Sequence, residues 1–188
     1  MGIEVSGAQT ATSLAADPAF TATYAPLTEQ IWIPSASLVN VAGGSAFEVI
    51  GSSSALRWKG WSLDAVTTEA VFWEGILPDH WTAADVYVAL ANPAASAGNV
   101  VLTLTHTNVT DGGSMNSEVT DGSVVIAAAG QYIMSVDLLK ASSAVAPNRI
   151  VRLEIQRDGG HGSDTLANDI YVMGVILRST AAPVGWLQ

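Results

Sequence analysis

Short segments in which apolar and polar residues alternate follow one another along most of this chain. A period of two residues is that of a β-strand with one buried face. No amphipathic helix lies between the segments, although a parallel sheet would need such helices as connections. The expected strands are Ala46–Ile50, Leu56–Leu63, 68–77, 85–91, 100–108, 117–127, 131–139, 149–157 and 168–179.

The alternation also predicts which side chains point into the core of an antiparallel sheet. Threonines separate the apolar residues of the strand at 100–108, and charged or amide residues separate those of the strand at 149–157. The expected inward residues are Leu102, Leu104 and His106; Val151, Leu153 and Ile155; and, as one row in the last strand, Tyr171, Met173, Val175 and Leu177.

The connections between these strands carry residues typical of turns, such as Pro78-Asp79, Asn92-Pro93, Asp121-Gly122 and Asp158-Gly159. Proline fixes its own φ, and aspartate and asparagine bond to nearby backbone, so these pairs favour chain reversal. About eight short antiparallel strands joined by such turns predict an all-β fold. We expect a β-sandwich, and favour its jelly-roll version.

The first part of the chain differs from the rest. Residues 1–44 are expected to form an extended N-terminal arm, and residues 45–188 the jelly-roll domain. Up to about residue 30 neither a helical nor a strand period persists, so this segment cannot offset its ordering entropy alone. Its large side chains suit docking on a partner, with a free tail as the alternative. They are Phe20, Tyr24, Ile31 and Trp32.

Composition limits the classes of partner. Charged residues make up 13% of the chain, against roughly 25% in average soluble domains. We therefore expect a homo-oligomer with much surface buried between copies; the alternative is an exposed face rich in Ser, Thr and Asn. A net charge of −10 argues against nucleic acid and anionic membranes.

Compartment signals are sparse. The chain has no cysteine, which excludes disulfides and thiolate metal sites. No apolar run reaches the roughly 18 residues of a membrane span. A secretory signal would require Lys or Arg near the N-terminus, and none precedes Arg57. We therefore expect synthesis and assembly in a host cytoplasm.

One loop, DGGHGSD, contains possible metal ligands in Asp158, His161 and Asp164. A metal would want more ligands and a partner for the histidine, whereas glycines between aspartates are typical of a tight turn. We favour the turn, with Asp164 and Thr165 bonding to loop backbone before the last strand.

Two carboxylate pairs, Glu69 with Glu74 and Asp79 with Asp85, allow a glycosidase interpretation. Spacing in sequence cannot show that the members of a pair meet. No nucleophile elbow, phosphate loop or dinucleotide fingerprint occurs. The sequence therefore predicts no catalytic, cofactor-binding or metal site, and a protein that is not an enzyme.

The six tryptophans are the most informative side chains. Trp73, with Trp58 or Trp61, is expected in the core. Trp81 follows the Pro78-Asp79 turn and is expected to be partly exposed beside Asp79. An exposed aromatic next to a carboxylate suits a subunit interface or stacking on a sugar ring, and we favour the interface.

Several of these features occur together in one known family. The run F-W-x-x-x-L-P-D-x-W at 72–81, Gly98-Asn99-Val100, the run R-x6-D-T-L from Arg157 to Leu166, and Gly174-Val175 follow in order. This pattern resembles a jelly-roll domain of tailed-bacteriophage virion proteins, and the resemblance covers residues 45–179. It implies a structural component that is usually trimeric and has no catalytic residues.

The resemblance leads to a prediction of function. We expect a capsid decoration (cement) protein, a homotrimer on the capsid surface of the virion whose arm clamps neighbouring copies of the major capsid protein. The first alternative is a tail-fibre or receptor-binding tip that recognises host surface glycan through Asp79, Trp81 and the loop at 158–164. The second is a glycan hydrolase on a sandwich fold.

Overall fold

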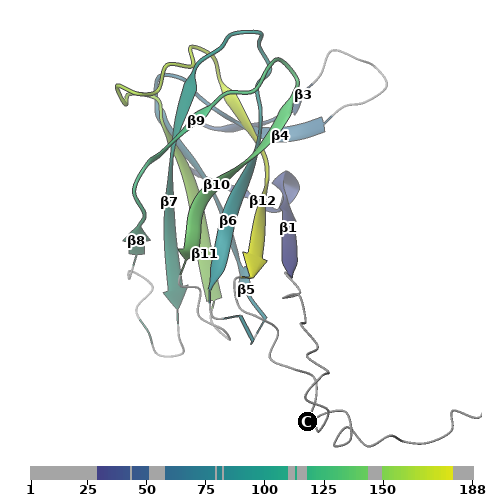
Figure 1. The fold of residues 1–188 in the computed structure, drawn as a ribbon, viewed down its shortest axis with the longest axis vertical. Coiled ribbons are helices and arrows are strands. Elements are labelled where there is room, and N and C mark those ends of the chain that lie inside the picture. The colour runs from purple at the N-terminus through teal and green to yellow at the C-terminus, as the bar shows by residue number, and fades with distance from the viewer. Residues whose placement is uncertain are drawn as a thin grey trace, which may run out of the picture.

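The structure, a computed structural model, describes residues 29–42, 44–50, 58–78, 80, 81, 83–109, 113, 118–143 and 150–179. These residues form twelve β-strands and one short 3-10 helix, η1 (Ser35–Ser37). They contain no helix that is long and apolar enough to cross a membrane. The strands build two sheets that pack face to face as a jelly-roll β-sandwich (Figure 1). The all-β prediction is confirmed.

Each sheet has six strands, and every strand pair is antiparallel. Sheet A has the order β10 (Met134–Ser143), β6 (Ala84–Ala91), β12 (Ile170–Ser179), β4 (Trp58–Leu63), β3 (Ala46–Ile50). Strand β1 (Gln30–Pro34) also pairs with β12, along the part of β12 that follows its pairing with β4. Sheet B has the order β2 (Val39–Ala42), β5 (Thr68–Ile76), β11 (Ile150–Asp158), β7 (Asn99–Val109), β8 (Glu118–Thr120), with β9 (Val124–Ala127) also on β7.

The core lies between the sheets and follows the predicted alternation in β11. Val151, Leu153 and Ile155 are buried in the main hydrophobic cluster, while the residues between them lie on the outer side of sheet B. The ladders that join β11 to β5 and to β7 run without a register shift. An uninterrupted alternation therefore fixes one face of sheet B against the core.

Two sequence expectations change in detail. The strand expected at 117–127 is two strands, β8 and β9, that pair with the same strand β7. One extra residue between Thr120, opposite Thr105, and Val124, opposite Leu102, interrupts the ladder, and the Asp121 N–H donates to the Leu104 carbonyl at 2.8 Å there. The single row expected in the last strand is also wrong. A register shift between Val172 and Gly174 breaks the row, so Met173 lies outside the main core while Val175 lies within it.

The described part of the sandwich begins before the boundary expected at residue 45. β1 and β2 belong to the two sheets, so Ile31 and Trp32 lie in a strand and not in an extended arm. Ile31 packs against the main core. Phe20 and Tyr24 lie outside the described residues. The first and last described residues meet, since the Ser179 N–H donates to the Glu29 carbonyl at 2.9 Å.

A buried ion pair joins the loops at the opposite end of the sandwich. Arg157, at the end of β11, is 0% exposed, and its partner Asp164 is 1% exposed. Two parallel bonds join them, Nη2 to Oδ1 at 2.9 Å and Nε to Oδ2 at 3.0 Å. The three remaining N–H groups of the guanidinium donate to the carbonyls of Leu63, Asn168 and Leu166. All five donors of the side chain are thus satisfied.

The same loop is tied to β7. Asp164 Oδ2 also accepts from the Val101 N–H at 3.0 Å, and Thr165 Oγ1 accepts from the Asn99 N–H at 2.9 Å. Asp164 and Thr165 were expected to bond loop backbone before the last strand; the side chains accept instead from backbone N–H groups of strand β7. The R-x6-D-T-L run therefore holds strands of both sheets in place at this end.

Arg157→Met should destabilise the fold by about 3–5 kcal/mol, because it leaves the Asp164 carboxylate buried without its partner. Denaturation in urea, followed by tryptophan fluorescence, measures the loss. The control is Arg152→Met on the same strand. The Arg152 side chain is partly exposed and forms ion pairs with Glu154 and Glu74, so its loss should cost about 1 kcal/mol or less. Equal losses in the two variants would contradict the role of the buried pair.

Candidate functional site

The outer side of sheet A carries the most distinctive side chains of the described residues. Residues directly opposite each other on paired strands share a face, so the strand register identifies this surface, here called the sheet A face. Its rows are Met134, Ala91, Tyr171, Ser62 and Ala46; Val136, Ala89 and Gly174; Leu138, Tyr87, Ile176 and Trp32; and Asp85, Arg178 and Gln30.

Trp32 is half exposed on this face, with 50% of its surface accessible. Its indole lies over Gly174: a Cβ built on Gly174 would come within 2.5 Å of Trp32 Cη2 and within 2.5 Å of the Ile33 carbonyl oxygen. Only a residue without a side chain fits there, so Gly174 makes the seat for the ring. Because Ile31 and Ile33 point inward from the same short strand, Trp32 must point outward.

A cation stacked on an aromatic ring lies on the neighbouring strands. The Arg178 guanidinium carbon is 4.7 Å from the centre of the Tyr87 ring, and its Nη1 donates to the Tyr87 hydroxyl at 3.2 Å. Arg178 Nε is buried and has no hydrogen-bond partner. The stack places a planar ring in the row that contains Trp32 and a positive group in the next row.

A second polar pair lies where β3, β4 and β12 meet. The Tyr171 hydroxyl donates to Glu48 Oε2 at 2.8 Å, and the Ser62 hydroxyl donates to Asp169 Oδ2 at 2.9 Å. Burial of the phenol, followed by its hydrogen bond to Glu48, raises the pKa of Tyr171 to about 12. Tyr171 is therefore a neutral donor, and Glu48 an exposed acceptor, at neutral pH.

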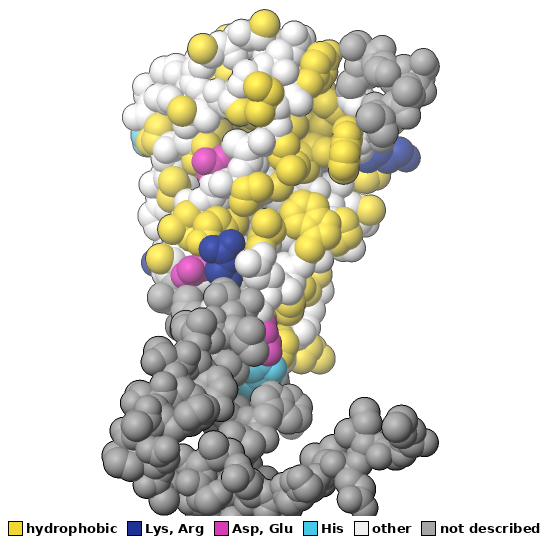
Figure 2. All heavy atoms as spheres, turned by 45° about the vertical axis from the view of Figure 1, so that its right-hand side comes forward, with side chains coloured by type: hydrophobic (Ala, Val, Ile, Leu, Met, Phe, Trp, Pro, Cys, Tyr) yellow, Lys and Arg dark blue, Asp and Glu magenta, His cyan; other side chains and the backbone are white. Residues whose placement is uncertain are grey.

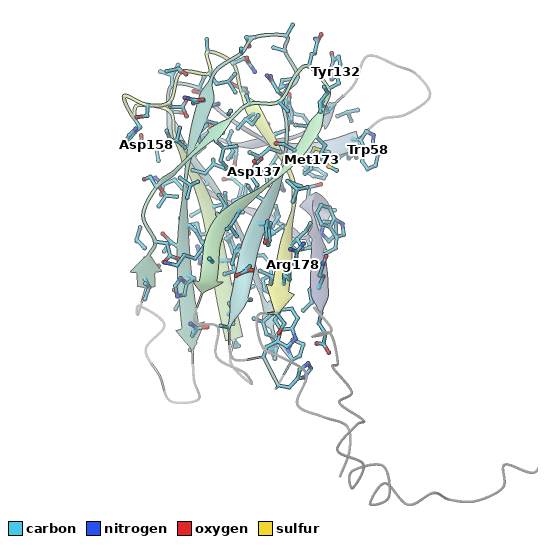
Figure 3. The ribbon with its side chains drawn as sticks, viewed as in Figure 1. Trp58, Tyr132, Asp137, Asp158, Met173 and Arg178 are labelled. Atoms are coloured by element: carbon cyan, nitrogen blue, oxygen red, sulfur yellow. The ribbon has the colours of Figure 1, made fainter. Side chains whose placement is uncertain are left out.

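Apolar side chains occupy most of the remaining sheet A face. Ala89, Ala91, Met173 and Ile50 form a second, smaller buried cluster. Trp58 is 64% exposed, and Figure 3 places it to one side of Met173, with Arg178 lower on the same sheet. Figure 2 shows hydrophobic side chains spread over the side of the molecule that carries β1 and β12, with few charged groups among them.

The outer side of sheet B differs in chemistry. Arg152 lies across it, with its Nη1 3.6 Å from Glu74 Oε1 and its Nη2 3.0 Å from Glu154 Oε2, and threonines of β7 line the next strand. The outer side of sheet B therefore carries polar and charged side chains, together with the exposed apolar pair Ile76 and Ile150. Sheet A offers rings and apolar surface, which are the usual lining of a small-ligand or polymer site.

The predicted contact residue Trp81 does not contribute to this surface. Its side chain is 1% exposed within the main core, so the expectation of a partly exposed ring is wrong. After Pro78 the chain turns, with the Trp81 N–H donating to the Pro78 carbonyl, and Nε1 of the indole donates to Glu29 Oε2 at 2.7 Å. Glu29 thus satisfies the indole and allows the ring to be buried. Asp79 lies outside the described residues.

The other chemical candidates separate in space. Glu69 and Glu74 are an odd number of residues apart on β5; Glu69 is buried and accepts from the Asp64 N–H, while Glu74 lies on the outer side of sheet B. Burial raises the pKa of Glu69. In the DGGHGSD loop, Asp164 is held by Arg157. No group of three metal-ligating side chains occurs among the described residues.

Sequence reasoning missed most of the sheet A face. Tyr87 alternates with the buried Val86 and Val88, a pattern that marks an outward ring in a strand that is otherwise apolar. Arg178 is equally visible as the outward neighbour of the buried Leu177. The position of Gly174 beneath Trp32 had no signal, because it depends on the pairing of β1 with β12.

Comparisons with known proteins identify the fold. No family model matches the chain, and no curated protein matches it in sequence. The xylan-binding domain CBM22-2 of Xyn10C from Paenibacillus barcinonensis matches in structure with a TM-score of 0.51 and 11% identity, over 80% of this chain and 99% of that one. The two chains therefore share the jelly-roll fold.

Two further solved structures match less closely. The carbohydrate-binding module CBM36 in complex with calcium and xylotriose has a TM-score of 0.44 and 18% identity, over 80% of this chain and 99% of that one. The CBM36-1 domain of a multidomain xylanase from the hindgut metagenome of Trinervitermes trinervoides has a TM-score of 0.48 and 9% identity, over 81% and 98%.

The prediction of a capsid decoration protein is contradicted by this comparison, because the neighbour with a TM-score above 0.5 is a xylan-binding domain and not a virion protein. The jelly-roll part of the resemblance is supported, and its bacteriophage part is not. The neighbour is named as a binding domain, and the expectation that this protein is not an enzyme stays a prediction. The homotrimer, the major capsid protein as partner and the virion location are not tested and stay predictions.

Gly174→Ala should destabilise the fold by about 1–3 kcal/mol, because the new Cβ would overlap the Ile33 carbonyl and the Trp32 ring. It should also displace Trp32 and change the tryptophan emission. Urea denaturation and fluorescence spectra measure the two effects. Gly122→Ala is the control, since nothing lies within 4 Å of its added Cβ. Similar losses of stability in both variants would contradict the claim that Gly174 makes room for the Trp32 ring.

Tyr171 should make stability depend on alkaline pH. Its pKa of about 12 in the folded state exceeds the ordinary 10.0, so its contribution is complete below pH 10 and is lost as pH rises from 10 to 12. Melting temperature in Tyr171→Phe should therefore fall less steeply over that interval than in the wild type. Absorbance of tyrosinate should show the late-titrating phenol disappear in this variant, and parallel melting curves would contradict the assignment.

Proposed function

We propose that this protein is a glycan-binding domain whose binding surface is the sheet A face. The observation that carries the proposal is Trp32, half exposed on its Gly174 seat beside the Arg178–Tyr87 stack. Flat aromatic rings pack against the apolar faces of sugar rings, while fixed donors and acceptors bind the hydroxyl groups. The sheet A face provides both kinds of group.

The polar groups suit a neutral glycan. The Tyr171 hydroxyl near the start of β12 and the Arg178 guanidinium near its end are donors. Glu48, the partner of Tyr171, is an acceptor. The rings lie on β1, β6 and β4, so a chain of several sugars lying across the strands could contact more than one ring. The xylan-binding neighbour supports a jelly-roll sandwich as a scaffold for such a surface.

This proposal keeps the glycan alternative considered for the sequence but changes its residues. Trp81 is buried and the loop at 158–164 is held by Arg157, so neither provides the surface. A tail-fibre or receptor-binding location stays a prediction that nothing tests. The proposed function concerns recognition of the polymer only.

Native gels that contain dissolved xylan, mixed-linkage glucan or galactan test the proposal, because a binding domain is retarded. Retardation is expected in at least one gel. Trp32→Ala should weaken the binding about tenfold or more, as expected for loss of a central aromatic contact. Trp58→Ala should weaken it as well.

The matched control is Ile76→Ala, an exposed apolar position on the outer side of sheet B. It should leave retardation unchanged. Wild-type mobility that no polysaccharide changes would contradict the proposal, and so would equal losses in Trp32→Ala and Ile76→Ala. Circular dichroism confirms that each variant is folded.

A further inference from the structure

Strand β10 is the end strand of sheet A. It spans ten residues, Met134–Ser143, and pairs with β6 along one edge. From Met134 to Leu138 this pairing is regular, and register shifts occur only after Leu138. Among the described residues no strand pairs with its other edge. The backbone N–H and C=O groups on that edge therefore have no partner strand among the described residues, as is usual for an edge strand.

The outward side chains of this regular stretch do not protect the edge, and its one inward charge, Asp137, protects it only against strands that bring no donor. Met134, Val136 and Leu138 point to the outer side and are 55%, 46% and 42% exposed. Edge strands usually avoid pairing through lysine, proline, bulges or inward charges. Here the irregularities come after Leu138, and Lys140 is occupied by an ion pair to Asp121 at 2.7 Å.

The inner side of the same stretch carries two polar groups. Ser135 lies opposite Leu90, and Asp137 lies opposite Val88, so both point toward the interior side of sheet A. The carboxylate oxygen Oδ2 of Asp137 is buried and has no hydrogen-bond donor. A buried acceptor without a donor costs free energy, and a donor brought by a partner would remove that cost.

We propose that the protein forms a twofold-symmetric dimer in which β10 pairs antiparallel with β10 of a second copy, with Val136 on the axis. In this register Met134 lies opposite the partner's Leu138, and Ser135 lies opposite the partner's Asp137. Each serine hydroxyl donates to a carboxylate that lacks a donor in the single chain, and this happens twice by symmetry. The acidic group thus meets a neutral donor on the partner and not another acid.

The polar match is specific to this register. Rotation about χ2 of aspartate is broad, so the Asp137 carboxylate can turn either oxygen toward the partner's Ser135. A shift of one residue would place inner polar groups against outer apolar ones. A second copy is therefore the occupant that the strand itself specifies, and the low share of charged residues, 13%, agrees with buried surface between copies.

The dimer would join two six-stranded sheets into one. Both sheet A faces would then lie on the same side of the joined sheet and could engage one polymer together. The dimer rests on β10 alone and does not depend on glycan binding. Absence of retardation in polysaccharide gels would leave it standing, and a monomer that binds glycan would overturn only the dimer.

Sedimentation equilibrium of the full chain across the micromolar range tests the association. A dimer mass that increases with concentration is expected. Val136→Lys should weaken the dimer at least about tenfold, because two lysines would face each other on the axis. The control Val125→Lys changes an equally exposed valine on β9 of sheet B and should leave the mass unchanged.

A cysteine trap tests the register. The chain has no cysteine, so Val136→Cys introduces the only thiol. Directly opposite residues of antiparallel strands have Cα atoms about 4.5–5.5 Å apart, which a disulfide can bridge. Mild oxidation should give a covalent dimer from Val136→Cys and little from Val125→Cys.

Three results would overturn the proposal. The first is a monomer throughout the concentration range. The second is a trimer, because an edge pairing about a twofold axis closes at two copies. The third is a dimer that Val136→Lys leaves intact or that Val136→Cys does not cross-link, since its interface would then lie elsewhere. Melting curves exclude loss of folding as the cause.

Discussion

The buried pair of Arg157 and Asp164 is the interaction on which this sandwich depends. A β-sandwich has loops at its ends, and loop backbone needs hydrogen-bond partners that a sheet does not supply. One guanidinium here provides five donors, two to Asp164 and three to carbonyls of the end of β4 and of the loop before β12. Because the pair is fully buried, neither charge can be removed without exposing the other to an apolar environment.

Most of the fold could be predicted from the chain. The central strands follow an alternation that only a half-buried strand satisfies, and turn residues set their limits, so β5, β6, β7 and β11 begin and end close to where they were expected. The short strands β1 and β2 lie within the expected arm and show no strand pattern of their own. They have few residues, and their pairing partners lie far along the chain.

The site could not be predicted in the same way. The sequence shows that a ring such as Tyr87 faces outward, but the set of rings that share a face follows from the register between distant strands. Trp81 shows the opposite error. A tryptophan beside a turn suggested an exposed ring, and its partner Glu29, 52 positions away, allows it to be buried. The extra residue Met173 in the pairing of β12 with β6 puts Met173 and Val175 on opposite faces, and the strand's own pattern does not show this shift.

The backbone bond between Ser179 and Glu29 has a topological consequence. The first and last described residues are neighbours in space, at the end of the sandwich away from Arg157. Any chain that continues on either side of residues 29–179 must leave through the same point. The sandwich could thus be spliced into a loop of another protein, or its ends joined and a new opening cut elsewhere, without crossing either sheet.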